Sequence, residues 1–281
     1  MKIKILSDST CDLPAELAAK YDIGILPLTV IKDGKNYVDG VTITPAEIFR
    51  HVAEGGDLCS TSAINYGDYL NEFQKYAPGY DGVICINLGS QFSSCYQNAT
   101  LAAGEFTNVR AVDSANLSTG QGRVVLKAAE LAETAEDLDQ LKQDIEDYAK
   151  RVEISFLLNR LDYMVKGGRC SSATALGANL LHLRPCIEVK DGKMTVVKKY
   201  RGSYEKCLTN YIKDRLNGRE DLEKDLMFLT FTEVEDSTLN AVRSAIDTYG
   251  HFDCRYEGTA GCTISCHCGP DTVGIVLVRK A

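Results

Sequence analysis

The first half of the chain alternates short apolar runs with amphipathic segments. Apolar segments at residues 2–6 and 82–87 predict strands, a further strand is expected at 109–113, and each is followed by a polar loop and a predicted helix. Strands separated by helices are typical of a parallel sheet covered by helices. We therefore predict an N-terminal parallel α/β domain over residues 1–151.

Local signals place further elements in this half. Asp33-Gly34 predicts a hairpin turn between β-rich residues 23–31 and Tyr37-Val38. Thr44 followed by Pro45 and Glu47 predicts a helix start with a capping box. Four more helices are expected at residues 14–20, at 68–76, from near Ser93, and from the glycine-rich loop to about residue 131. The charged segment 134–150 predicts a solvated connecting helix.

The pattern changes after residue 151. Asp191-Gly192 predicts a hairpin between residues 185–189 and 194–198, which requires an antiparallel pair. The remaining elements are strands at 154–158, 226–231, 262–265 and 273–278, and helices at 171–181, 204–216 and 237–249. The expected fold class is thus α/β with two domains, the second (152–281) being α+β with a mixed sheet.

Polar loops follow the three apolar strands of the first half. In open α/β sheets, ligands bind outside the carboxyl ends of the strands, where such loops meet. This places Asp8, Ser93 and Ser114 along one edge of the predicted sheet. We expect the ligand site there.

Composition narrows the functional classes. The formal charge is −8, with 39 acidic and 31 basic residues, and no Lys/Arg-rich run indicates nucleic-acid binding. Polar residues follow the initial Met too soon for a signal peptide, and no apolar run reaches the ~20 residues of a membrane span. We expect a soluble, cytoplasmic protein whose 11 cysteines are free thiols.

His267 lies in Gly-Cys-Thr-Ile-Ser-Cys-His-Cys-Gly-Pro, interpreted here as a strand that ends at a Gly-Pro break. Such a histidine can face a ligand, or it can be satisfied by a backbone carbonyl. The neighbouring cysteines raise the question of zinc. Strand alternation would point Cys266 and Cys268 away from His267, and no Cys-x-x-Cys pair is present, so we expect no metal.

Hydroxyl groups are the other candidate ligands. Ser93 and Ser94 precede a predicted helix, where backbone N–H groups and hydroxyls together bind anions; Ser93 can equally be an ordinary N-cap. Thr61-Ser62 lies in a polar loop, where such residues usually form a turn or a helix cap. Arg169, after Gly167-Gly168, is either a solvated charge or a carboxylate or phosphate ligand.

Several segments together resemble the DegV family, which includes the FakB proteins that carry fatty acids to fatty acid kinase. They are Ser-Asp-Ser-Thr-Cys-Asp-Leu-Pro at 7–14, Thr61-Ser62, the Phe-Ser-Ser-Cys-Tyr-Gln block at 92–97, Val-Asp-Ser at 112–114 with its glycine-rich continuation, Gly167-Gly168-Arg169, and His-Cys-Gly-Pro at 267–270. The resemblance spans nearly the whole chain.

The resemblance implies a lipid-binding carrier rather than an enzyme, with no cofactor and a long-chain fatty acid as ligand. The implied carboxylate ligands are Thr61, Ser93 and His267, with Ser62, Ser94 and Arg169 beside them. It also implies a separate ATP-dependent fatty acid kinase, with Arg201 on the partner-facing surface, and transient contact with a membrane surface. The C-terminal domain would be the lipid-binding one.

Two other functions use the same residues. Ser93 and His267 could be the nucleophile and base of a serine hydrolase, although the chain has no Gly-x-Ser-x-Gly elbow and no evident orienting acid. The hydroxyl cluster would also suit a smaller anion such as a phosphorylated metabolite. A P-loop is missing, so kinase activity of this chain itself is not expected.

Overall fold

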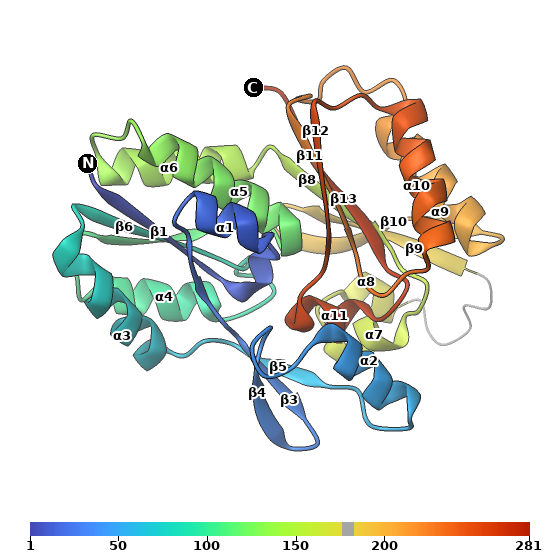
Figure 1. The fold of residues 1–281 in the computed structure, drawn as a ribbon, viewed down its shortest axis with the longest axis horizontal. Helices are drawn as coiled ribbons and strands as arrows, with labels where there is room; N and C mark the ends of the chain where they lie inside the picture. Colours follow the sequence, from blue (N-terminus) through green and yellow to red (C-terminus); the bar gives the residue numbers. More distant parts are fainter. Residues whose placement is uncertain (176–182) are drawn as a thin grey trace.

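The computed structural model of the protein describes residues 1–175 and 183–281. The described strands form three sheets: a parallel sheet from the first half, a mixed sheet from the second half, and a small antiparallel sheet (Figure 1). Figure 1 shows the first two side by side, with the small sheet projecting below them. The predicted fold class, a parallel α/β sheet followed by a mixed α+β sheet, is confirmed.

The parallel sheet has the strand order β2-β1-β6-β7, and all its pairings are parallel. Its strands are β1 (Ile3–Asp8), β2 (Gly24–Leu26), β6 (Gly82–Asn87) and β7 (Val109–Asp113). Every residue of β6 is buried, which explains its continuous apolar run, because helices cover both faces of the sheet.

The two faces of this sheet bury alternate residues of each strand. Ile84 and Ile86 of β6 pack on the side of α5 (Ser118–Ala132) and α6 (Leu138–Ala149). Val83 and Cys85 pack on the opposite side, against α3 (Tyr66–Tyr76) and α4 (Cys95–Ala103). The short helix α1 (Ala15–Lys20) lies on the α5 side (Figure 1).

The mixed sheet has the order β10-β9-β8-β13-β11-β12. Its strands are β8 (Val152–Leu157), β9 (Leu183–Lys190), β10 (Lys193–Arg201), β11 (Leu226–Phe231), β12 (Cys254–Thr259) and β13 (Val273–Val278). Only β11 and β12 pair in parallel; the other pairings are antiparallel. The predicted β9–β10 hairpin turns at Asp191-Gly192, where both residues have positive φ.

Helices cover both faces of the mixed sheet. One face carries α9 (Tyr204–Leu216) and α10 (Asp236–Tyr249). The other packs against α5 of the first half, so Val124 and Val125 share one apolar core with Ile154 and Val276. The core is therefore continuous between the two halves.

The small sheet has the order β4-β3-β5, from β3 (Thr29–Lys32), β4 (Lys35–Val38) and β5 (Ser60–Ser62). The predicted hairpin at Asp33-Gly34 is present, and α2 (Pro45–Ala53) begins with the predicted capping box. Its third strand corrects the sequence interpretation: Thr61-Ser62 lies in β5, paired with β3, and is no turn or cap.

The segment around His267 is also corrected. Residues 262–265 were expected to be a strand, yet Cys262–Cys268 forms the helix α11. The strand that pairs at this edge of the sheet is β12, which the sequence did not predict. Because α11 is helical, the strand-alternation argument about the cysteines beside His267 no longer applies.

Smaller differences concern element ends. The helix expected at 171–181 begins as α8 (Ser171–Thr174), and residues 176–181 of that prediction lie outside the described residues. A further short helix, α7 (Asp162–Gly167), precedes it, and single 3-10 turns occur at η1 (Ser9–Cys11) and η2 (Ala77–Gly79). Within the described residues, no helix has the length and apolarity required to cross a membrane.

Candidate functional site

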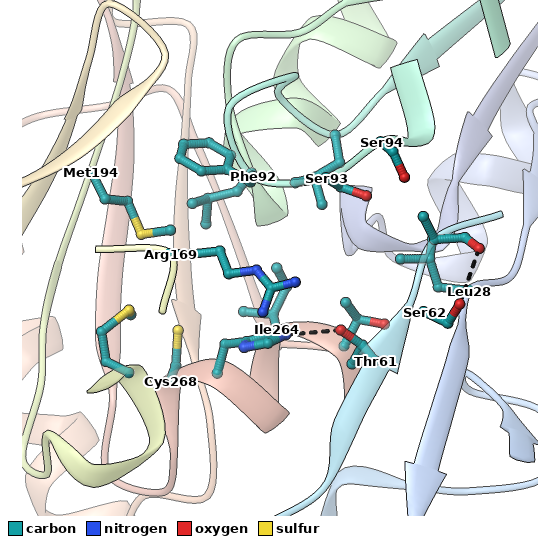
Figure 2. Close-up of a pocket in the computed structure, with 16 residues that line it drawn as sticks. Leu28, Thr61, Ser62, Phe92, Ser93, Ser94, Arg169, Met194, Ile264 and Cys268 are labelled. Carbon is teal, nitrogen blue, oxygen red and sulfur yellow. Dashed lines mark hydrogen bonds between the residues drawn. The ribbon is translucent and has the colours of Figure 1, made fainter. Parts of the chain in front are cut away.

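A cavity of about 250 Å³ opens where the loops of the parallel sheet face α11 and α7 (Figure 2). We call it the head cavity. Its walls come from both halves of the chain. All six residues predicted to bind the ligand line it: Thr61, Ser62, Ser93, Ser94, Arg169 and His267. Apolar walls are supplied chiefly by Leu28, Leu88, Phe92, Leu117, Met164 and Met194.

Thr61 and His267 form the central polar contact. Thr61 Oγ1 lies 2.9 Å from His267 Nε2, and Figure 2 shows this bond joining β5 to α11. Because either atom can donate, the pair can reverse its hydrogen bond when a ligand arrives. Nε2 of His267 therefore bonds to a side-chain hydroxyl and not to a backbone carbonyl, which was the other possibility for this histidine.

The other ring nitrogen is closely packed. His267 Nδ1 is buried and has no hydrogen-bond partner among the residues that the structure describes. A Cβ atom on Gly167 would lie only 2.5 Å from this nitrogen, so α7 can approach α11 here because residue 167 is glycine. Burial, with a contribution from the charge of Arg169, lowers the pKa of His267 to about 4. The ring is thus neutral at neutral pH.

Ser93 and Ser94 face the cavity from the loop between β6 and α4. Ser93 Oγ accepts a hydrogen bond from the Cys95 N–H at 3.2 Å, and Ser94 occupies the N-cap position without a side-chain cap bond. Helix α4 begins at Cys95, two residues later than predicted. Ser93 is therefore not the N-cap residue, but its hydroxyl accepts the first N–H of the helix while it lines the cavity.

Arg169 supplies charge. Among the described residues that line the head cavity, it is the one with a permanent positive charge. Its Nη1 donates to the Gly167 carbonyl at 2.5 Å, and its guanidinium points into the space between Ser93 and Thr61 (Figure 2). The side chain is exposed and retains free N–H groups for an anion.

The strand-end loops meet as the sequence predicted, but two of the three polar residues serve packing. Asp8 is fully buried, and its Oδ2 accepts from the Leu88 N–H at 2.7 Å, which ties β1 to the loop after β6. Burial raises the pKa of Asp8. Ser114 is buried and bonds to Asn116. Of the predicted edge residues, only Ser93 lines the cavity.

Two carboxylates that the sequence analysis did not single out hold α11 in place. Asp12 Oδ1 accepts from the Gly261 N–H at 2.9 Å, and Asp39 accepts from the N–H groups of Cys262 and Thr263. Burial raises the pKa of Asp12 to about 8. Asp12 belongs to the opening motif at 7–14, but its partner lies 249 residues away, a separation that no local pattern reveals.

A smaller cavity of about 30 Å³, lined mainly by apolar residues together with one serine and four threonines, adjoins the head cavity. We call it the deep cavity. The two cavities share Leu117, Ile264 and Cys268 as lining residues. The deep cavity continues between α5 and the mixed sheet, where Ile154, Phe156, Phe231, Gly274 and Val276 line it.

The remaining predicted residues lie elsewhere. Arg201 is exposed at the end of the edge strand β10, outside the residues that line either cavity. No group of three His, Cys, Asp or Glu side chains within residues 1–175 and 183–281 is arranged to hold a metal ion. Near His267, Cys262 Sγ instead donates to the Ile43 carbonyl at 3.1 Å.

Comparison with known proteins identifies the family. A sequence model of the DegV family matches residues 2–280. The chain belongs to the DegV family. It is 33% identical over 284 residues to a DegV domain-containing protein of Clostridium acetobutylicum, with 99% of each chain covered. It is also 29% identical over 291 residues to a fatty acid-binding protein of Thermotoga maritima, with 100% of each covered.

Solved structures of DegV proteins share the fold over the full length. A fatty acid-binding DegV protein from Thermus thermophilus superposes with a TM-score of 0.88 at 28% identity, covering 100% of both chains. A stearic acid-binding protein from Eubacterium ventriosum superposes with a TM-score of 0.85 at 25% identity, covering 99% of this DegV chain and 98% of that one.

Proposed function

We propose that this DegV chain binds one long-chain fatty acid, with the carboxylate in the head cavity and the acyl tail in the deep cavity. The observation that carries the proposal is that the two cavities are neighbours: the head cavity, with its hydroxyls and one arginine, shares Leu117, Ile264 and Cys268 with the more apolar deep cavity. A polar site beside an apolar one suits a ligand with a carboxylate at one end and a hydrocarbon chain at the other.

The head cavity offers donors of the right kind for a carboxylate. The hydroxyls of Thr61, Ser93 and Ser94 can donate, and Ser62 lies beside them. His267 is neutral at neutral pH and can direct the Thr61 hydroxyl without supplying charge. The counter-charge then comes from Arg169, whose guanidinium faces the same space.

The apolar walls supply the affinity for the tail. Each methylene removed from water contributes about 0.8 kcal/mol, so a long chain gains far more from burial than the head group does. The deep cavity, at about 30 Å³, holds little free space, so the tail must displace side chains such as Ile264 and Phe156 as it enters. Binding and partial repacking of the core are therefore coupled.

The geometry argues against the hydrolase alternative. His267 Nε2 is paired with Thr61, and its Nδ1 has no orienting carboxylate among the described residues. Ser93 Oγ is engaged with Cys95. A Ser-His pair needs both a nucleophile–base contact and an orienting group. A small polar anion would use the hydroxyls but would leave the deep cavity unused.

The proposal extends to a partner. A carrier with a carboxylate near the surface can present it to a separate ATP-dependent kinase, which would transfer a phosphoryl group to form an acyl phosphate and ADP. Arg169 at the cavity and exposed Arg201 on β10 would face that kinase, and a cytoplasmic protein would meet membranes only transiently. In this scheme residues 152–281 form the lipid-binding domain and residues 1–151 the domain that contributes the hydroxyl-bearing loops.

Selective retention tests the proposal. The delipidated protein is titrated with a labelled long-chain fatty acid, with its methyl ester, and with a short-chain acid. We expect tight retention of the long-chain acid alone, because the ester lacks the charge and the short acid lacks the tail. Equal retention of the acid and its ester would refute the proposed carboxylate site. Equal retention of the long and short acids would refute the proposed tail site.

A further inference from the structure

Two buried cysteines lie close in sequence to the Thr61–His267 pair. Cys59 lies immediately before β5, two residues before Thr61, and Cys266 precedes His267 by one residue in α11. Both belong to one apolar cluster, with 8% and 3% of their surface exposed. The two cysteines flank the 2.9 Å contact between Thr61 and His267, and an interaction between their thiols shifts the pKa of both.

The surroundings of the two thiols differ in charge. The hydrogen bond from Cys266 lowers the pKa of Cys59, and the nearby His51 and Lys32 act in the same direction, while burial and Asp33 oppose it. The same hydrogen bond raises the pKa of Cys266, with burial adding to the effect. By contrast, burial raises the pKa of both Cys262 and Cys268 to about 12. Cys59 therefore has the most thiolate character of these cysteines of the α11 region.

We propose that Cys59 and Cys266 form a reversible disulfide on exposure to a hydroperoxide, and that this disulfide weakens retention of the ligand carboxylate at Thr61 and His267. The second part rests on the proposed fatty acid function, whereas the first part does not. Disulfides are rare in reducing compartments, and those that do form there are usually transient or redox-sensing. This is consistent with a chain whose cysteines are free thiols in the structure.

The reaction balances with a hydroperoxide as oxidant. The Cys59 thiolate attacks the peroxide oxygen, the O–O bond breaks, and the products are a sulfenic acid and an alcohol, or water when the oxidant is hydrogen peroxide. The Cys266 thiol then attacks the sulfenic sulfur, forming the S–S bond and releasing one water. A small dithiol then reduces the disulfide by exchange: it forms a mixed disulfide, is itself oxidised to a cyclic disulfide, and leaves both cysteines as thiols.

The short S–S bond of the disulfide would disturb the Thr61–His267 contact. A disulfide joins its sulfurs at about 2 Å, much closer than two sulfurs in a hydrogen-bonded contact can approach. The closely packed interior cannot absorb this contraction without moving β5 relative to α11. Thr61 and His267, two and one residues from the bridged cysteines, move with them, and their 2.9 Å contact is disturbed.

Peptide mapping tests the disulfide itself. The delipidated full-length protein is treated with hydrogen peroxide, quenched in acid, and alkylated under denaturing conditions so that every remaining thiol is labelled. We expect a cross-linked peptide pair containing Cys59 and Cys266, lighter by two hydrogen atoms and lost on reduction with dithiothreitol. Cys59→Ser and Cys266→Ser should each abolish it, and Cys254→Ser, at the exposed cysteine, should not. Oxidation confined to Cys254, or a linkage between other cysteines, would overturn the proposal.

Retention of a labelled fatty acid tests the consequence. Peroxide treatment should weaken retention by wild type at least about tenfold, as expected when a hydrogen bond to a charged group is lost, and dithiothreitol should restore it. Cys59→Ser should retain ligand normally before and after peroxide. A mapped Cys59–Cys266 linkage without change in retention would refute the regulatory role. Because the linkage is scored by mass without ligand, a failure of fatty acid binding would be recognised separately.

Discussion

The hydroxyl of Thr61 lies 2.9 Å from Nε2 of His267, although the two residues are 206 positions apart in the sequence. This contact joins the small antiparallel sheet of the first half to the helix α11 of the second. It also places the two groups at the wall of the head cavity, which adjoins the small deep cavity. The contact is where the two halves of the chain make one site.

Replacing Thr61 with valine tests this contact with little change in shape. We expect Thr61→Val to weaken retention of a long-chain fatty acid by a factor of about ten to one hundred, because a hydrogen bond to a charged group contributes about 1.5–3 kcal/mol. Thr61→Ser keeps the hydroxyl and should stay near wild type. Equilibrium titration with labelled fatty acid measures both. Equal losses in the two variants would assign the effect to packing.

His267 should make the delipidated protein less stable in mild acid. Its pKa is about 4 when folded and about 6.5 when unfolded. As the pH falls from 6.5 to 4, the unfolded chain therefore takes up a proton that the folded chain does not. The free energy of unfolding should drop by up to about 3 kcal/mol over this window, with no further drop from this group below it.

The matched variant is His267→Gln, which keeps a polar side chain without titrating. Denaturant unfolding at several pH values should show a shallower pH dependence between pH 4 and 6.5 for this variant than for wild type. Parallel curves would mean that His267 titrates normally in the folded protein.

Ser93→Ala distinguishes a carrier from a hydrolase. We expect weaker fatty acid retention, again by roughly tenfold or more, because a donor to the carboxylate is lost. Wild type and variant should both fail to hydrolyse a chromogenic ester, since Ser93 has no contact with His267 among the hydrogen bonds of the site. Ester turnover by wild type that disappears in Ser93→Ala would favour the hydrolase instead.

Much of the fold could be predicted because local signals agree with the tertiary structure. Strand β6 is a continuous run that is buried by helices on both faces, and the Asp33-Gly34 and Asp191-Gly192 turns have the positive φ that their residue types favour. The capping box at Thr44 is formed entirely within six residues of the helix start. Such features need no distant partner.

The elements that were missed depend on distant partners. The α11 segment is short and rich in cysteine and β-branched residues, so its local propensity does not favour a helix. Asp12 and Asp39 accept its first N–H groups from more than 220 residues away and stabilise the helical form. Likewise β5 is a strand because β3 pairs with it, and β12 is a half-exposed edge strand with little apolar signal. The pairing of Thr61 with His267 follows from these same contacts.

Arg201→Ala tests the proposed partner surface. In a reconstituted reaction with a fatty acid kinase and ATP, this variant should form acyl phosphate several-fold more slowly than wild type, because a charge at the docking surface mainly affects association. Its retention of fatty acid should be unchanged, since Arg201 lies outside both cavities. Lys193→Ala, an exposed charge at the other end of β10, is the control. Lost fatty acid retention in Arg201→Ala would place this residue at the ligand site.

Native mass spectrometry of the protein purified from cells tests the central claim most directly. The account predicts a species heavier than the polypeptide by one long-chain fatty acid, which is released on denaturation and identified in the lipid extract. Thr61→Val purified in parallel should carry a smaller fraction of it. Only the unliganded mass, both as purified and after incubation with long-chain fatty acids, would contradict the account.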